Sequence, residues 1–84
     1  MMTSKIFVGN LPFSVDNDKL QEAFTSFGEI LSAKVIIDRN SGRSKGFGFV
    51  EFAEPEFAQA AIDGMNEKPL DGRNLTVSFA KSQN

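Results

Sequence analysis

The chain has 84 residues, of which 40% are apolar, so it is long enough for one small domain with a hydrophobic core. It contains neither cysteine nor histidine, which excludes disulfides and thiolate metal sites and removes the commonest general base and zinc ligand. Eleven acidic residues against nine basic ones give a net charge of −2, so the chain as a whole does not attract a polyanion over long distances.

The first predicted element is a strand over residues 5–9, Lys-Ile-Phe-Val-Gly. Side chains alternate between the two faces of a strand, so Lys5 and Phe7 share one face while Ile6 and Val8 share the other. A charged side chain is very rarely buried without a partner, and the face that carries Lys5 is therefore the solvent face. The strand places an aromatic ring on a wet surface beside a cation.

A helix is predicted after a loop over residues 10–14. Asp16 is a good N-cap, and Gly28 stands where a helix commonly ends. Apolar residues recur between them at helical spacing, which predicts that they pack in the core; they are Leu20, Ala23, Phe24 and Phe27. Residues 30–37 follow as a strand, β-branched towards its end.

The most informative stretch is the strand over residues 45–52. Its residues on one face are Lys45, Phe47, Phe49 and Glu51, and those on the other are Gly46, Gly48, Val50 and Phe52. The two charges place the first set in solvent, so two more rings lie next to a cation. Burying each ring would be worth about 1.5–3 kcal/mol, and their exposure therefore calls for a functional explanation.

The glycines of this strand face the core, where the absence of a side chain lets a helix approach the sheet closely. The strand follows a turn-rich loop over residues 38–44 that carries Arg39 and Arg43. A phosphate-binding P-loop is not indicated, because no Gly-Lys-Ser/Thr ending leads into a helix.

The remainder of the chain predicts a second helix and a last strand. Pro55 fits the first turn of the helix, and its apolar stripe consists of Ala58, Ala61, Ile62 and Met65. Residues 66–69 are interpreted as a loop, and Asp71-Gly72 as a tight reversal. In the last strand Leu75, Val77 and Phe79 share one face, and Asn74, Thr76 and Ser78 share the other. The polar set is suited to contacts with base edges.

Together the strands predict a platform of three exposed rings, Phe7, Phe47 and Phe49, fringed with positive charge. Rings of this kind stack on unpaired bases while cations hold the phosphates. Most acidic residues fall in the predicted helices and most basic ones on the strands or the loop between two of them, which predicts a molecule with an acidic back and a basic front. The element order strand, helix, strand, strand, helix, strand predicts an α+β, ferredoxin-like sandwich. In that fold two helices cover one face of a four-stranded antiparallel sheet.

Two motifs resemble those of the RNA recognition motif family. Residues 6–11, Ile-Phe-Val-Gly-Asn-Leu, are similar to its shorter ribonucleoprotein motif, and residues 45–52 match the longer one. The resemblance spans about residues 5–81 of a single domain, residues 1–84. It implies that both motif strands lie side by side in the middle of the sheet.

The resemblance also implies a role for individual residues. Phe7 and Phe49 would each stack on a base, Phe47 would pack against the sugars between them, and Lys45 would contact the phosphate. If the pleat of the strand over residues 30–37 follows the family, Lys34 and Ile36 lie on the platform. The arginine-bearing loop closes over RNA in the family; the alternative is a solvated hairpin connection. The expected RNA-binding residues are Lys5, Phe7, Asn10, Lys34, Ile36, Arg39, Arg43, Lys45, Phe47, Phe49, Asn74, Thr76, Ser78 and Lys81.

The function implied is binding of short single-stranded RNA with a dissociation constant of about 1 μM. Two alternatives stay open: a protein-interaction module of the same fold, and binding of single-stranded DNA, because stacking does not itself read the 2′-hydroxyl. An enzyme is not expected, since the acids are scattered over predicted helix surfaces. We expect no metal, cofactor, small-molecule substrate or membrane partner. We expect a monomer in the cytoplasm, or in the nucleus of a eukaryotic host.

Overall fold

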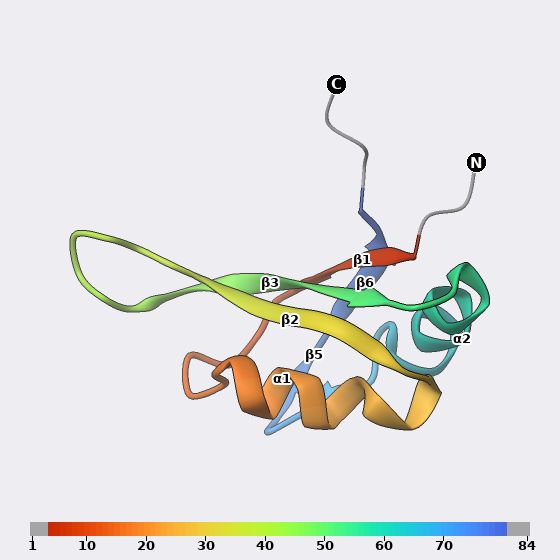
Figure 1. Ribbon diagram of the computed structural model, residues 1–84. Helices are drawn as coiled ribbons and strands as arrows, with labels where there is room; N and C mark the ends of the chain where they lie inside the picture. The colour runs from red at the N-terminus through yellow and green to blue at the C-terminus, as the bar shows by residue number, and fades with distance from the viewer. Residues whose placement is uncertain (1–3, 81–84) are drawn as a thin grey trace.

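A computed structural model of the protein describes residues 4–80. They form two layers, with two helices packed on one face of an antiparallel four-stranded sheet (Figure 1). The strands of this sheet are β1 (Lys5–Gly9), β2 (Ile30–Ile37), β3 (Ser44–Phe52) and β6 (Thr76–Phe79), and the helices are α1 (Asn17–Phe24) and α2 (Pro55–Met65). The strand order β2-β3-β1-β6 puts the two motif strands, β1 and β3, in the middle. The predicted ferredoxin-like sandwich is confirmed.

Apolar side chains from both layers form the core. On β1, β3 and β6, the side chains predicted to face inward are buried in the core or packed against it. Burial of one face of a sheet sets the register of every strand in this way. The buried hydrophobic residues of this core are Ile6, Val8, Leu11, Val15, Leu20, Phe24, Val35, Val50, Phe52, Ala58, Ala61, Leu75 and Val77.

The first helix begins as predicted but ends earlier. The Asp16 carboxylate accepts a hydrogen bond from the Lys19 N–H group at 2.9 Å, which is the N-cap interaction. The α-helix stops at Phe24, and the last predicted turn is a 3-10 helix, η1 (Thr25–Phe27). At Gly28 a side chain would collide with the ring of Phe57 from α2. The tight turn and the glycine let the chain leave the helix beneath α2.

The two core-side glycines of β3 serve different purposes. A Cβ atom at Gly48 would lie 2.5 Å from the Lys34 carbonyl oxygen, 3.1 Å from the Cα atom of Val35 and 3.2 Å from Cδ2 of Leu20. The close approach there is to the backbone of β2 and also to a side chain of α1, as predicted. Gly46 adopts φ +87°, and the atoms nearest its missing Cβ atom, the Leu11 carbonyl oxygen and Cε1 of Phe13, lie 3.8 Å away, an ordinary contact distance. Its glycine is required by backbone conformation at an irregularity in the β2–β3 pairing, and not by an approaching helix as the sequence predicted.

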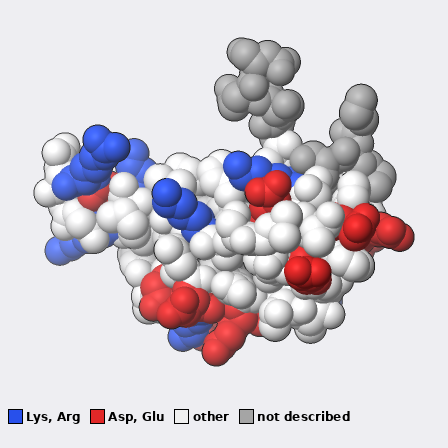
Figure 2. Space-filling model, in the orientation of Figure 1, with Lys and Arg blue, Asp and Glu red and all other residues white. Residues whose placement is uncertain are grey.

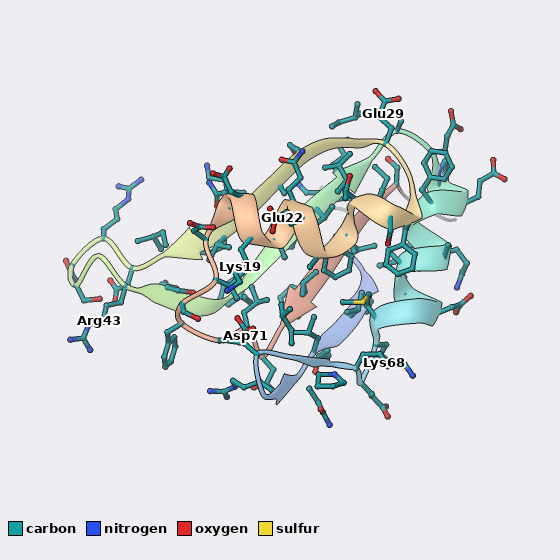
Figure 3. All side chains as sticks on the ribbon, turned by 90° about the horizontal axis from the view of Figure 1, so that it is seen from below. Lys19, Glu22, Glu29, Arg43, Lys68 and Asp71 are labelled. Carbon is teal, nitrogen blue, oxygen red and sulfur yellow. The ribbon has the colours of Figure 1, made fainter. Side chains whose placement is uncertain are left out.

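Before the last strand the chain forms a small hairpin that the sequence shows only in part. β4 (Pro69–Leu70) pairs with β5 (Arg73–Asn74) through the predicted Asp71-Gly72 reversal, and both turn residues have positive φ. Asn74 therefore belongs to this hairpin and not to the four-stranded sheet. The Lys19 ammonium group contacts the Asp71 carboxylate at 3.0 Å and ties the hairpin to α1, as the two labelled side chains in Figure 3 show.

Each outer strand of the sheet has one backbone N–H group satisfied by an asparagine side chain. The Val35 N–H group of β2 donates to the Asn17 side-chain oxygen at 2.7 Å, at the start of α1. The Val77 N–H group of β6 donates to the Asn66 side-chain oxygen at 2.9 Å, just after α2. Within residues 4–80, no helix has the length and apolar character that crossing a membrane requires.

Candidate nucleic-acid interface

The sheet face opposite the helices carries the three predicted rings in one cluster. The ring centroid of Phe7 lies 5.7 Å from that of Phe47 and 5.7 Å from that of Phe49, and the Phe47 and Phe49 centroids are 6.3 Å apart. The ring of Phe49 is edge-on to the rings of Phe7 and Phe47, an arrangement that aromatic pairs favour. The three rings are half-buried rather than fully exposed, because they shield one another's sides. Their cluster is called the ring platform below.

The strand register places the platform in rows across the sheet. Lys34 of β2 lies opposite Phe49, which lies opposite Phe7, which in turn lies opposite Ser78 of β6. Lys34 and Ser78 are exposed at the two sides of this row. A cation and a hydroxyl therefore flank the two rings that the family resemblance assigns to base stacking.

The neighbouring row contains Gly9, which supports the ring of Phe7. Gly9 lies opposite Phe47 on one side and Thr76 on the other. A Cβ atom at Gly9 would lie 2.9 Å from Cε2 and 3.1 Å from Cζ of Phe7, so the ring lies down over the glycine. The absent side chain fixes where the platform presents this ring. Ile36 of β2 is half-buried, and Thr76 is exposed.

Positive charge follows the open face. The Lys5 ammonium group lies 5.4 Å from the centroid of the Phe49 ring, a cation–π distance, and Lys45 is exposed on the same strand as Phe47. Glu51 lies opposite Lys5 in the register, so one carboxylate sits among the cations. Figure 2 shows most visible Lys and Arg side chains along the upper, open side and the hairpin end, and most Asp and Glu side chains over the helices.

The loop between β2 and β3 extends the sheet beyond the body of the molecule (Figure 1). The Asp38 N–H group donates to the Arg43 carbonyl at 2.8 Å, and the Gly42 N–H group donates to the Asp38 carbonyl at 2.8 Å. Arg39 and Arg43 are exposed, and Figure 3 shows Arg43 pointing away from the body at the hairpin tip. The loop is a closed hairpin that carries its two cations outward.

At the other end of β1 a polar network joins the platform to the small hairpin. Asn10 adopts φ +60°, a left-handed conformation that asparagine tolerates. Its side chain donates to the Asn74 carbonyl at 2.6 Å and accepts from the Arg73 guanidinium group at 2.8 Å. Arg73 lines a groove of about 340 Å³ together with Phe7 and Phe47. Sequence reasoning missed Arg73, because only the fold brings the hairpin to this groove.

Sequence reasoning also missed Phe13. The residue lies in the loop between β1 and α1 and exposes 70% of its surface. It lines the groove of Arg73 and a larger cavity beside it. Its signal in the sequence is an apolar residue in a short loop, which by itself is ordinary.

The remaining expectations concern the tail and metals. Lys81 lies outside the described residues. Within residues 4–80, no group of three or more acidic side chains is arranged to hold a metal ion.

Comparison with known proteins agrees with this geometry. A family model described as the RNA recognition motif matches residues 6–76. The chain is 52% identical over 79 residues to a glycine-rich RNA-binding, abscisic acid-inducible protein of Zea mays, and 51% identical over 79 residues to the mitochondrial glycine-rich RNA-binding protein 4 of Arabidopsis thaliana. Each match covers 94% of this chain but only 50% and 58% of the relative.

Among solved structures, a Sxl-lethal protein–RNA complex superposes with a TM-score of 0.87 at 32% identity, covering 92% of this chain and 47% of that one. The segment matched by the family model, residues 6–76, includes the two motifs on β1 and β3 and both helices. With the ring platform on the open sheet face and a family match over most of its length, the chain belongs to the RNA recognition motif family.

Proposed function

We propose that this chain binds short single-stranded RNA on the ring platform. The observation that carries the proposal is the cluster of Phe7, Phe47 and Phe49 on the helix-free face, with ring centroids 5.7–6.3 Å apart. Unstacked bases find π-faces there, and exposed lysines stand beside them. The maize relative is named an RNA-binding protein and the superposed structure is a protein–RNA complex, which supports the same class of ligand.

The roles of the rings follow from their positions. Phe7 and Phe49 lie directly opposite each other on the two middle strands, so they offer stacking surfaces to two successive bases. Phe47 lies next to both and contacts the sugars between them. The Lys5 ammonium group over Phe49 moves aside when a base stacks on that ring face, and it then lies near the phosphate backbone.

The magnitudes describe a moderate binder. Stacking contributes about 1–3 kcal/mol per base, so two stacks supply about 2–6 kcal/mol. A dissociation constant of about 1 μM corresponds to about 8 kcal/mol, and phosphate contacts from residues such as Lys45 provide the remainder. Glu51, which faces Lys5 across the strands, opposes those contacts by repelling phosphate.

The test is a binding titration of a fluorescein-labelled random hexanucleotide RNA against the protein and its Phe49→Ala variant. We expect the variant to bind about 5- to 150-fold more weakly, the equivalent of one lost stack. Leu31→Ala is the matched control, because Leu31 is an apolar residue on β2 that is 60% exposed and lies outside the platform. Equal affinity of the Phe49→Ala variant and the unaltered protein, with both folded by circular dichroism, contradicts the proposal.

The same titration with a DNA hexanucleotide of matching sequence compares binding to ribose-containing and deoxyribose-containing strands. We propose RNA as the preferred ligand, and tighter binding of DNA would reverse that assignment. A protein-interaction role would instead shift backbone amide signals of α1 and α2, and we expect the shifts on RNA addition at β1 and β3.

We further propose that the chain is a monomer without catalytic activity, acting in the cytoplasm. The absence of histidine and cysteine from the sequence supports a binding role. Few large apolar side chains are exposed among residues 4–80, namely Phe13, Leu31 and Ile37, which supports a monomer. Sedimentation of the purified protein tests the oligomeric state, and fluorescence imaging of a tagged copy tests the location. Two relatives from Arabidopsis thaliana carry the word mitochondrial in their names, so imaging includes a mitochondrial marker.

A further inference from the structure

A carboxylate lies on the open sheet face, among the cations of the ring platform. Glu51 is half-buried on β3, and the register places it opposite Lys5 of β1 and Ser32 of β2. In the proposed complex this carboxylate repels the phosphates that the lysines attract. It therefore weakens binding unless it contacts an uncharged part of a nucleotide.

The register gives the ring of Phe49 four neighbours on the open face. Along β3 they are Phe47 and Glu51, because side chains two residues apart share a face, and their Cα atoms lie about 7 Å from that of Phe49. Across the adjoining strands they are Phe7 of β1 and Lys34 of β2. A base stacked on Phe49 has rings on two sides, a cation on the third and the carboxylate on the fourth.

The proposed position of the sugars orients this base. In the proposed complex Phe47 contacts the sugars between the bases on Phe7 and Phe49. The sugar of the base on Phe49 then lies on the Phe47 side, and the far edge of the base points the other way along β3, towards Glu51. The edge remote from the sugar is the Watson–Crick edge, by which proteins read unpaired bases. Glu51 is therefore placed to contact the edge that differs most between bases.

The chemistry of a carboxylate decides which bases it accepts. A carboxylate accepts hydrogen bonds and donates none. The Watson–Crick edge of guanine presents two adjacent donors, the N1–H and the N2 amino group, which match the two carboxylate oxygens in a strong, charge-assisted pair of bonds. Cytosine and adenine each offer one amino group beside an acceptor nitrogen. Uracil offers one N–H between two carbonyl oxygens, which the carboxylate repels.

We propose that Glu51 is the specificity-determining residue for the base stacked on Phe49, selecting guanine and disfavouring uracil. The inference rests on the proposed RNA binding and adds a base preference to it. Lys5 lies opposite Glu51, with its ammonium group 5.4 Å from the centroid of the Phe49 ring, so the repulsion between Glu51 and phosphate is partly offset at the same place. The carboxylate weakens binding to RNA in general and strengthens it where guanine occupies this position.

The test compares two fluorescein-labelled hexanucleotide RNAs in one buffer. The first consists of six uridines, and the second is the same strand with a guanosine at the fourth position. We expect the guanosine to raise the affinity about 5- to 150-fold, the discrimination of one bidentate base contact. A third strand carries inosine in place of guanosine. Inosine lacks the N2 amino group, so its strand should bind with an affinity between the other two.

Two substitutions separate base reading from charge. The amide of Glu51→Gln keeps the shape of the side chain but can also donate to uracil, so we expect the six-uridine strand to bind more tightly and the guanosine preference to fall. Glu51→Ala has no hydrogen-bonding group and should show no preference. Glu22→Gln removes the same charge from α1 on the helical side (Figure 3) and should leave the preference unchanged. Thermal denaturation checks that each variant is folded.

The outcomes distinguish this inference from the proposed function. Equal affinity of the unaltered protein for the guanosine and six-uridine strands, or tighter binding of six uridines, overturns the role of Glu51. The same guanosine preference in the Glu51→Ala variant also overturns it. In each of these cases RNA binding on the platform stands if Phe49→Ala weakens binding of both strands. If the unaltered protein binds neither strand, the proposed function falls and the base preference falls with it.

Discussion

Gly9 shows how one missing side chain shapes the binding surface. The ring of Phe7 lies over it, and a methyl group there would lie 2.9 Å from Cε2 of that ring. The contact is with the far end of a side chain that can turn away, so the fold can adapt. The cost falls on the orientation of the ring rather than on the core.

We therefore predict that Gly9→Ala leaves the thermal midpoint nearly unchanged and weakens RNA binding. The loss should be part of one stack, roughly tenfold or less. Thermal denaturation and a hexanucleotide titration measure the two effects on the same sample. Unchanged affinity would mean that the position of the Phe7 ring does not limit stacking.

The residues of the platform were predictable from the sequence, but Arg73 and Phe13 beside it were not. Side chains alternate between the two faces of a strand, and two phenylalanines of β3 share a face with Lys45 and Glu51. Because charged side chains are rarely buried, that face must be the one exposed to solvent. Arg73 and Phe13 follow no such rule. The first is brought to the groove by the hydrogen bond with Asn10, and the second by a turn anchored on β3, and both are tertiary effects.

At the scale of elements, Gly48 decides how close β2 and β3 can pair. A Cβ atom would meet backbone atoms of Lys34 and Val35, which cannot turn away, and a methyl group of Leu20 at 3.2 Å. At Gly42, in the hairpin loop, the space is open and only the positive φ of +71° disfavours a side chain. A substitution at Gly48 therefore tests the effect of crowding, and one at Gly42 tests the effect of backbone conformation alone.

We predict that Gly48→Ala lowers the free energy of unfolding by about 3 kcal/mol, the upper range for overpacking. Gly42→Ala should lower it by about 1 kcal/mol, the cost of a left-handed residue. Urea denaturation of both variants gives the comparison. A Gly48→Ala variant as stable as Gly42→Ala would show that β2 moves freely, contrary to the contacts described.

The ion pair between α1 and the β4–β5 hairpin has a defined pH dependence. The hydrogen bond between Lys19 and Asp71, together with the attraction between their charges, raises the pKa of Lys19 above its ordinary value of 10.5. A raised pKa in the folded state means that the stabilisation is present in full below the pKa of the unfolded chain. It is lost as the pH rises through the higher folded value. Both side chains are exposed enough that the effect on stability is small.

We predict that Asp71→Asn lowers the pKa of Lys19 towards 10.5. Asparagine tolerates the positive φ of this turn position, so the hairpin should remain. Carbon NMR of the lysine side chain between about pH 9 and 12 measures the shift. A pKa that does not change would show that the pair is not formed in solution.

The order of the main elements was predictable from periodicity, while their ends and small additions were not. Helical spacing runs through Phe27, yet the last turn tightens to a 3-10 helix because α2 packs over Gly28. Pro69 has the composition of a loop, but it pairs with Asn74 once the reversal at Asp71 forms. Short pairings of this kind depend on neighbours that periodicity does not record.

At the scale of the whole molecule, the net charge of −2 and the basic open side act over different distances. Beyond a Debye length of about 8–10 Å the molecule presents no positive field to RNA. In the proposed complex, Lys45 and its neighbours would meet the phosphates only within contact distance. We therefore expect the proposed binding to be local and sensitive to salt, without strong electrostatic acceleration of association.

We predict that the logarithm of RNA affinity falls with the logarithm of salt concentration, and that Lys45→Gln makes this slope shallower by about 0.7. Lys19→Gln is the control with the same change of charge, because Lys19 lies on α1, on the helical side. Hexanucleotide titrations over a range of potassium chloride concentrations give both slopes. Equal slopes for the two variants would remove Lys45 from the phosphate contacts.

The asparagines beside the two outer strands have a consequence for chains at high concentration. An outer strand is a template on which another polypeptide can add a strand and begin to aggregate. At Val35 and Val77 the outward N–H group is already engaged by Asn17 and Asn66, so an incoming strand finds its ladder interrupted on both borders. A domain that must leave one whole sheet face uncovered can in this way keep its margins from seeding fibrils.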